Sequence, residues 1–274
     1  MIHFTLNNGI EIPAVGLGTF RSKDEDAYNA VLHAIKVGYR HIDTAAVYRN
    51  EAAVGRAIKD SGVPREELFV TTKIYNGDQG YMNTRRAVVA SLEKLGLDYV
   101  DLFLIHWPVS YELSRDTYRA LEDMHIEGYT RSIGVSNFNF HHLEHLFETA
   151  EIMPVVNQVE SHVYLQNEKL QDFCMRHGIR LEAYAPFLSH KISELFKDET
   201  LQDLAKKYGK TIPQLVLRYQ VEREIVVLPK SITPARIEEN LDIFGFQLSE
   251  EDFKTMHSLN RAWKIFPEAD NFSE

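Results

Sequence analysis

Short apolar runs alternate along the chain with longer stretches in which apolar residues follow helical spacing. In residues 26–37 the apolar positions recur at i, i+3 and i+4, the pattern of one buried helix face. They are Ala27, Ala30, Val31, Ala34 and Ile35. Residues 84–95 repeat this spacing. The pattern therefore predicts helices over 26–37 and 84–95.

The apolar runs between the helical stretches are rich in β-branched residues and predict eight strands. They cover 15–18, 41–43, 68–73, 100–106, 132–136, 155–158, 180–184 and 225–229. Strands of nearly continuous apolar character that alternate with helices are typical of a parallel sheet buried on both faces. Eight such repeats predict a (β/α)8 TIM barrel. An open doubly wound sheet is the alternative, but Gly16-Leu17-Gly18 lacks the third glycine of its phosphate-binding turn.

The chain begins with a predicted β-hairpin, because residues 4–6 and 10–12 flank Asn8-Gly9, a strong two-residue turn signal. No linker or low-complexity tract follows. We therefore expect one domain over 1–274, since a β/α barrel of about 250 residues is commonly a single unit. The longest irregular connection is predicted at 189–194, and we expect residues 189–196 to close over a cofactor.

Composition narrows the class of protein. The single cysteine, Cys174, excludes an intrachain disulfide and favours a reducing, cytoplasmic location; within a helical apolar stripe it is expected to fill the core. A formal net charge of −10 disfavours binding to nucleic acid or to an anionic membrane. No apolar run reaches the ~20 residues of a membrane span, and residues 1–9 lack the features of a signal peptide. We expect a monomer.

Polar residues stand where the predicted strands end, and reacting groups of β/α barrels sit at the carboxyl ends of strands. Asp43, Lys73 and His106 end three successive strands, and Tyr48 follows Asp43 by five residues. Each residue alone has an ordinary structural explanation. Asp43 could cap a helix, Lys73 could be a solvated strand end, and His106 could be a hydrogen-bonded core histidine. Tyr48 could cover an amphipathic surface. Four ionisable types that converge on one mouth favour a catalytic site.

These four residue types suit proton donation to a carbonyl. A phenol has a pKa near ~10, and a nearby buried ammonium lowers it. A carboxylate keeps the ammonium charged, and a neutral imidazole can orient the substrate oxygen. The hydride would come from a cofactor. A barrel hydrolase would need facing carboxylates or a metal triad, and neither is evident; His141, His142 and His145 are expected to lie on a solvated helix face, with no metal site.

The sequence resembles the aldo-keto reductase family, in particular bacterial aldehyde and ketone reductases, over residues 10–262. The stretches that carry the resemblance are Val15-Gly16-Leu17-Gly18-Thr19, His41-Ile42-Asp43-Thr44-Ala45 with Tyr48 and Asn50-Glu51, Thr72-Lys73, Leu104-Ile105-His106-Trp107-Pro108, Ile133-Gly134-Val135-Ser136-Asn137-Phe138, Asn157-Gln158 and Leu228-Pro229-Lys230-Ser231. The resemblance implies a nicotinamide cofactor bound without a Rossmann domain and hydride transfer to an aldehyde or ketone.

Matched position by position, the resemblance implies that Tyr48 is the general acid, that Lys73 and Asp43 tune it, and that His106 orients the carbonyl. It also implies a set of cofactor-binding residues: Thr19, Asp43, Ser136, Asn137, Gln158, Tyr184, Leu228, Lys230, Ser231, Arg236, Glu239 and Asn240. Ser136, Asn137 and Gln158 would hold the nicotinamide carboxamide and Tyr184 would stack on its ring. The residues near the adenosine end would be Ser231, Arg236, Glu239 and Asn240.

Two basic residues bear on whether the expected cofactor is NADPH or NADH. Lys230 and Arg236 match the family's contacts to the 2′-phosphate, which favours NADPH over NADH. This agrees with the need of a phosphate for cationic partners and with the anion affinity of a helix N-terminus, near which Arg236 is expected.

Several positions depart from the family pattern and concern the substrate. Phe20 and Tyr75 replace tryptophans, Ala185 a serine, and Trp263 and Phe266 an arginine and a glycine. The expected substrate-binding residues are Phe20, Tyr48, Tyr75, His106 and Trp107. Phe20, Tyr75 and Trp107, with Trp263 as a further candidate, would form an aromatic wall. Such a wall favours a small or apolar carbonyl substrate. The leading hypothesis is an NADPH-dependent carbonyl reductase; the alternative is a redox-sensing or interaction module with weak reductase activity.

Overall fold

The computed structural model describes residues 1–266, and the expected domain over 1–274 extends beyond them into 267–274. Within the described part, eight parallel strands pair in the order β3 to β10, so each strand lies beside its neighbour in the sequence. Their bounds are β3 Leu17–Gly18, β4 His41–Asp43, β5 Phe69–Ile74, β6 Leu102–Ile105, β7 Ile133–Ser136, β8 Val156–Glu160, β9 Arg180–Tyr184 and β10 Val226–Leu228. A parallel bridge between Val15 and Val227 joins the first and last strands, which confirms the predicted (β/α)8 TIM barrel.

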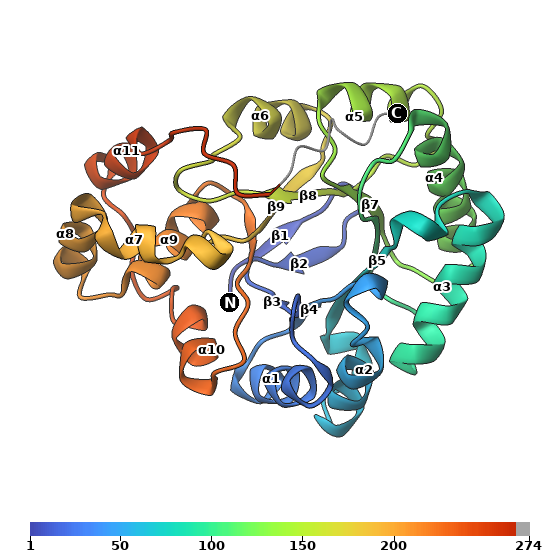
Figure 1. Ribbon diagram of the computed structural model, residues 1–274, viewed down its shortest axis with the longest axis horizontal. Helices are drawn as coiled ribbons and strands as arrows, with labels where there is room; N and C mark the ends of the chain where they lie inside the picture. The colour runs from blue at the N-terminus through green and yellow to red at the C-terminus, as the bar shows by residue number, and fades with distance from the viewer. Residues whose placement is uncertain (267–274) are drawn as a thin grey trace.

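A ring of helices surrounds the strands, as Figure 1 shows. The helices are α1 Asp24–Val37, α2 Glu51–Asp60, α3 Tyr81–Leu95, α4 Tyr111–Ile126, α5 Phe140–Phe147, α6 Glu168–Arg176, α7 Ser193–Lys197, α8 Glu199–Tyr208, α9 Ile212–Glu222, α10 Pro234–Leu241 and α11 Glu250–Ser258. One helix follows each of β3 to β8, whereas α7, α8 and α9 follow β9, and α10 and α11 follow β10. Short 3₁₀ turns occupy η1 Ala46–Tyr48, η2 Arg65–Glu67, η3 Asn76–Asp78 and η4 Ser189–Lys191. Most helices bury their apolar faces against the strands in one large core, and α7, α8 and α11 pack with part of α9 in a second apolar cluster.

The predicted N-terminal hairpin is confirmed as β1 His3–Thr5 paired antiparallel with β2 Glu11–Pro13. The Ala14 and Gly16 backbone leads directly from it into the barrel, where the Gly16 N–H donates to the Val227 carbonyl. Glycine is required at position 16, because a Cβ there would lie 2.7 Å from His41 Nδ1 and from a Leu228 methyl. Close approach of β3 to its neighbours therefore depends on the absence of a side chain.

Element ends differ from the predictions by a few residues, and for physical reasons. Helix α1 begins at Asp24 because three acidic residues fill its first turn, where the helix dipole favours negative charge. Strand β5 runs one residue later than predicted, through Ile74. The prediction of an irregular connection over 189–194 was wrong, since η4 and α7 occupy most of it. None of the helices in residues 1–266 combines the length and apolar character needed to cross a bilayer.

Candidate active site

The main cavity lies at the carboxyl ends of the strands and measures about 500 Å³. Asp43, Tyr48 and His106 line it from β4, η1 and the end of β6, and Lys230 lines it beyond β10. The barrel topology explains this convergence, because parallel strands present all their carboxyl ends at one mouth. The cavity therefore collects polar groups from segments far apart in the sequence.

Lys73 and Asp43 form an ion pair at the base of this cavity. Lys73 Nζ donates to Asp43 Oδ1 at 2.7 Å, to Oδ2 at 2.8 Å and to the Thr44 carbonyl at 2.9 Å. Burial alone would lower the pKa of Lys73, but the charge of Asp43 first, and then the nearby Tyr48 oxygen, more than offset it and leave this pKa raised. Lys73 is fully buried and holds its positive charge.

Tyr48 lies beside this ion pair and against two rings. Lys73 Nζ is 5.4 Å from the centroid of the Tyr48 ring. The ring centroids of Phe20 and His106 lie 5.1 Å and 5.7 Å from that of Tyr48. Lys73 lowers the pKa of Tyr48, as the sequence reasoning expected, but burial outweighs this effect and leaves the pKa raised. Tyr48 therefore keeps its proton in the cofactor-free protein at neutral pH.

His106 completes the polar floor of the cavity. Burial first, and then the nearby Lys73 charge, lowers the pKa of His106 to about 3. The imidazole is thus neutral at neutral pH, and one ring nitrogen carries a proton that it can donate. A protonated phenol, a buried ammonium and a neutral imidazole around one cavity can together protonate and orient a carbonyl oxygen.

A hydrogen-bonded group on β7, β8 and β9 forms another part of the cavity wall. Tyr184 donates from its hydroxyl to Asn137 Oδ1 at 2.8 Å, and Asn137 Nδ2 donates to the His106 carbonyl at 3.0 Å. Ser136 Oγ donates to the Gln158 carbonyl at 2.8 Å. All four candidates for the nicotinamide end of the cofactor, Ser136, Asn137, Gln158 and Tyr184, line the same cavity.

Two cations line the cavity where it opens past β10. Lys230 and Arg21 both face it, and neither forms an ion pair with a residue in the described part of the chain. Partial burial lowers the pKa of Lys230; the charge of Asp26 opposes this effect and the charge of Arg21 adds to it. In a protein with net charge −10, two unpaired cations at one mouth are suited to an anionic ligand such as a phosphate.

The other adenosine-end candidates lie outside the cavity wall. Arg236 is exposed in the first turn of α10. Glu239 accepts a hydrogen bond from Thr211 Oγ1 at 2.6 Å, and Asn240 is buried. Ser231 Oγ accepts from the Thr233 N–H. Two further cofactor-binding candidates lie at strand ends. Leu228 lines the cavity. Thr19 does not line it; its side chain is buried, and Thr19 Oγ1 donates to the Asp43 carbonyl.

The expected aromatic wall is only partly present. Phe20 and Trp107 line the cavity, but Tyr75 and Trp263 do not. The Tyr75 ring lies over Gly77, whose added Cβ would meet it at 2.9 Å, and Trp263 packs near Tyr164 with 6.1 Å between ring centroids. The resemblance to the family predicts where Tyr75 and Trp263 stand in the sequence, but not the direction in which their side chains point.

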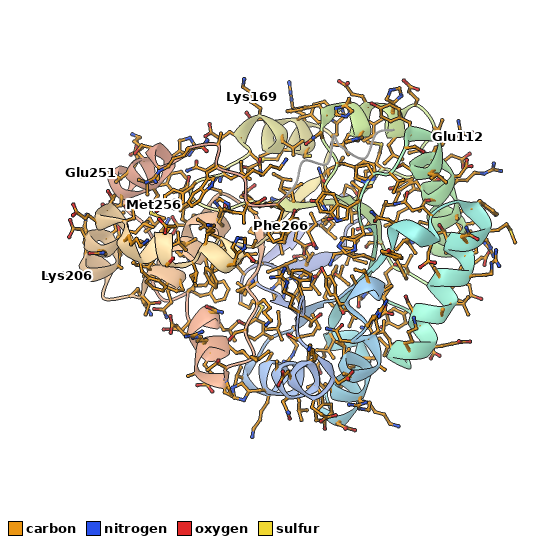
Figure 2. All side chains as sticks on the ribbon, in the orientation of Figure 1. Glu112, Lys169, Lys206, Glu251, Met256 and Phe266 are labelled. Carbon is orange, nitrogen blue, oxygen red and sulfur yellow. The ribbon has the colours of Figure 1, made fainter. Side chains whose placement is uncertain are left out.

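Phe266 takes part in the wall, and Figure 2 places it over the centre of the barrel. Its ring meets Tyr184 edge to face, with 5.5 Å between centroids. The buried Glu160 carboxylate at the end of β8 holds this segment by accepting the Ile265 N–H at 2.8 Å and the Phe266 N–H at 3.0 Å. Sequence reasoning missed Glu160, although an acidic residue at the end of a buried strand was a usable signal.

Glu182 is a second acidic residue that sequence reasoning missed. It lies in the middle of β9 and is fully buried, with its side chain inside the barrel. Burial, and after it the Asp43 charge, raises the pKa of Glu182 to about 8. The usable signal was a charged residue inside the apolar run Leu181-Glu182-Ala183.

The histidine cluster differs from its prediction. His142 is buried and accepts from the Asn139 N–H at 3.1 Å in a capping box of α5, so it does not lie on a solvated face. Tyr111 packs against the three rings, with 3.9 Å to that of His145. Across the described residues, no group of three or more His, Cys, Asp or Glu side chains is arranged to hold a metal ion. Cys174 is a free, buried thiol, as predicted.

Comparison with known proteins gives the same class of protein as the geometry. The model of the aldo/keto reductase family matches residues 14–261. The chain is 48% identical to glyoxal reductase of Bacillus subtilis over 266 residues, which cover 97% of this chain and 95% of that protein.

Solved structures extend the comparison. An aldo-keto reductase from a Medee basin deep-sea metagenome library superposes with a TM-score of 0.97 at 58% identity and covers 98% of both chains. A Bombyx mori aldo-keto reductase in complex with NADP superposes with a TM-score of 0.90 at 38% identity, covering 98% of this chain and 96% of that chain. The chain therefore belongs to the aldo/keto reductase family. It is an NADP-dependent oxidoreductase that acts on aldehydes and ketones.

Proposed function

We propose that the chain reduces small aldehydes or ketones with NADPH and that Tyr48 is the general acid. The observation that carries the proposal is the placement of Tyr48, Asp43 and His106 around one cavity, with Lys73 hydrogen-bonded to Asp43 behind its wall. The identity to a glyoxal reductase supports a small carbonyl substrate. The cavity wall formed by Phe20, Trp107 and Phe266 supports an apolar face around it.

Each of the four catalytic-site residues has a separate role in the proposed reduction. His106 donates a hydrogen bond to the carbonyl oxygen and orients it. Tyr48 delivers a proton to the same oxygen as the carbonyl is reduced. Lys73 stabilises the phenolate that remains, since its ammonium charge lowers the pKa of Tyr48. Asp43 holds that ammonium in place through two hydrogen bonds. Proton donation by a positioned acid contributes about 10²–10⁴ in rate.

The residues present fit a nicotinamide cofactor. Gln158 faces the cavity with its side chain, and Gln158 Oε1 accepts no hydrogen bond from a described residue. An amide N–H of the nicotinamide carboxamide suits that acceptor. We place the 2′-phosphate near Lys230 and Arg236, with Ser231, Glu239 and Asn240 at the adenosine end, and we include Thr19 and Leu228 among the cofactor-binding residues. When bound, the cofactor supplies the hydride.

The test is a turnover assay of the wild-type protein that follows loss of NADPH absorbance with glyoxal, methylglyoxal, aromatic aldehydes and keto-sugars. We expect turnover with small carbonyls. A protein that binds NADPH but reduces none of the panel would contradict the proposal and support the alternative, a redox-sensing or interaction module with weak reductase activity.

We further propose that the protein is a cytoplasmic monomer of one domain. The thiol of Cys174 is buried and unpaired, which suits a reducing compartment. Light scattering after size-exclusion chromatography tests the monomeric state. A mass of twice 31.6 kDa would contradict it.

A further inference from the structure

The interior of the barrel holds a buried carboxyl group that the proposed mechanism does not use. Glu182 extends from β9 beneath the cavity floor and is fully buried. Burying a carboxyl among apolar strands is costly unless it is hydrogen-bonded. An apolar residue in this run would have avoided that cost, so the partner of Glu182 indicates what the side chain does.

That partner is Gln158, the cofactor-facing amide on the adjacent strand β8. Gln158 Nε2 donates to Glu182 Oε2 at 2.6 Å and to Asp43 Oδ2 at 2.9 Å. The two N–H groups of one amide are therefore held by two different carboxyl groups. Among the described residues, Glu182 forms no hydrogen bond with Asp43, Tyr48, Lys73 or His106. Its link to Asp43 runs through the Gln158 amide.

The two contacts determine which way the amide faces. The last torsion of a glutamine side chain is broad, so one anchor leaves the amide plane free to turn. A turned amide would bring its carbonyl oxygen against the Asp43 carboxylate, which already accepts from Lys73. With both N–H groups held below, Gln158 Oε1 is the atom presented to the cavity.

Burial and the Asp43 charge favour the neutral form of Glu182, and the Lys73 charge opposes them. Asp43 and His41 face it from β4, and Lys73 faces it from β5. His41 Nε2 lies 3.6 Å from Glu182 Oε1, and burial lowers the pKa of His41 to about 3, so His41 brings no charge. A neutral carboxyl still accepts through its carbonyl oxygen. It adds no second negative charge beside Asp43.

We propose that Glu182 is a positioning residue: it fixes the Gln158 amide so that Oε1 faces the cavity to accept from the carboxamide of the nicotinamide. The inference rests on the proposed function, because that function places the nicotinamide against Gln158. Glu182 acts on the cofactor through Gln158 alone and takes no part in proton transfer to substrate.

The test compares the binding of two ligands to two variants. Glu182→Met removes the acceptor with little change in volume, and Glu182→Gln keeps an acceptor oxygen. Glu122→Gln is the matched control, a buried carboxyl on α4 that accepts backbone N–H groups far from the cavity. The ligands are NADPH and 2′-phospho-ADP-ribose, which lacks the nicotinamide. Dissociation constants are measured by fluorescence quenching and calorimetry.

We expect Glu182→Met to weaken NADPH binding about three- to ten-fold, the effect of one hydrogen bond. Binding of 2′-phospho-ADP-ribose should not change, and Glu182→Gln and Glu122→Gln should bind NADPH within two-fold of the wild type. Equal weakening of both ligands, or unchanged NADPH binding by Glu182→Met, overturns the inference. If the wild type binds both ligands equally well, the nicotinamide placement fails, and the proposed function and this inference are overturned together.

A measurement on the wild type covers the case in which Glu182→Met does not fold. The Gln158 side-chain amide is assigned in a nitrogen–proton spectrum by its loss in Gln158→Leu. In the cofactor-free protein its two protons should exchange slowly with solvent, because both are hydrogen-bonded in the barrel interior. Rapid exchange of either proton overturns the inference.

Discussion

Lys73→Met tests the proposed coupling between the buried ammonium and the Tyr48 phenol. Lys73 Nζ lies 5.4 Å from the Tyr48 ring centroid. At an effective dielectric constant of ~20, a unit charge at that distance contributes about 3 kcal/mol, which corresponds to about 2 pKa units. Removing the ammonium should raise the pKa of Tyr48 by that order, because Lys73 lowers it in the wild type. The alkaline limb of the profile of kcat/KM against pH should move upward.

The rate should fall as well, since a weaker acid transfers its proton more slowly; we expect kcat to drop about ten-fold or more. Asp43 loses its cation, and breaking a buried ion pair costs about 3–5 kcal/mol, so thermal unfolding must confirm that the variant is folded at the assay temperature. Lys207→Met is a matched control: Lys207 also pairs with one aspartate through two hydrogen bonds and lies 5.9 Å from a tyrosine ring, that of Tyr208. A pH profile unchanged by Lys73→Met would refute the coupling.

Four further predictions concern other parts of the molecule. Neutralising Lys230 and Arg236 together should weaken NADPH binding by about two decades, since each charge-assisted hydrogen bond contributes about 1.5–3 kcal/mol; equal weakening of NADH would show that they do not read the phosphate. Residues 187–199 should gain protection from hydrogen exchange when NADPH binds, and no gain would count against closure over the cofactor. Glu160→Gln should raise KM for the carbonyl more than it lowers kcat, because it loosens the C-terminal wall of the cavity; an unchanged KM would argue against this role. Wild-type protein should lose thermal stability relative to Glu182→Gln as the pH rises from 4.5 to 8, because over that range the unfolded chain releases the Glu182 proton and the folded chain retains it; parallel melting curves would contradict the raised pKa.

The barrel was predictable from the sequence because its signal is repetitive. Eight apolar runs separated by helical spacing admit few folds, and an error of one or two residues at each end changes nothing in the strand order. The convergence of Asp43, Lys73 and His106 followed from the same rule, since parallel strands end at one mouth. Tyr48 was found because its loop directly follows β4.

What escaped prediction depends on side-chain direction and on burial. Tyr75 turns over Gly77 and leaves the cavity, a rotamer choice that no spacing pattern encodes. The net pKa of Tyr48 is raised because burial outweighs Lys73, and the depth of burial is known only from the fold. Glu160 and Glu182 were passed over because each is a single acidic residue in a buried strand, and their partners lie on other segments.

The most direct test of the central claim is the Tyr48→Phe variant, measured for both NADPH affinity and turnover. The substitution removes one hydroxyl and keeps the ring against Phe20 and His106. Tyr75→Phe is the control, a loop phenol outside the cavity wall. The account predicts NADPH binding within two-fold of the wild type and kcat lower by about 10²–10⁴, with Tyr75→Phe unaffected. Reduction of small aldehydes by Tyr48→Phe at the wild-type kcat would contradict the assignment of Tyr48 as the general acid.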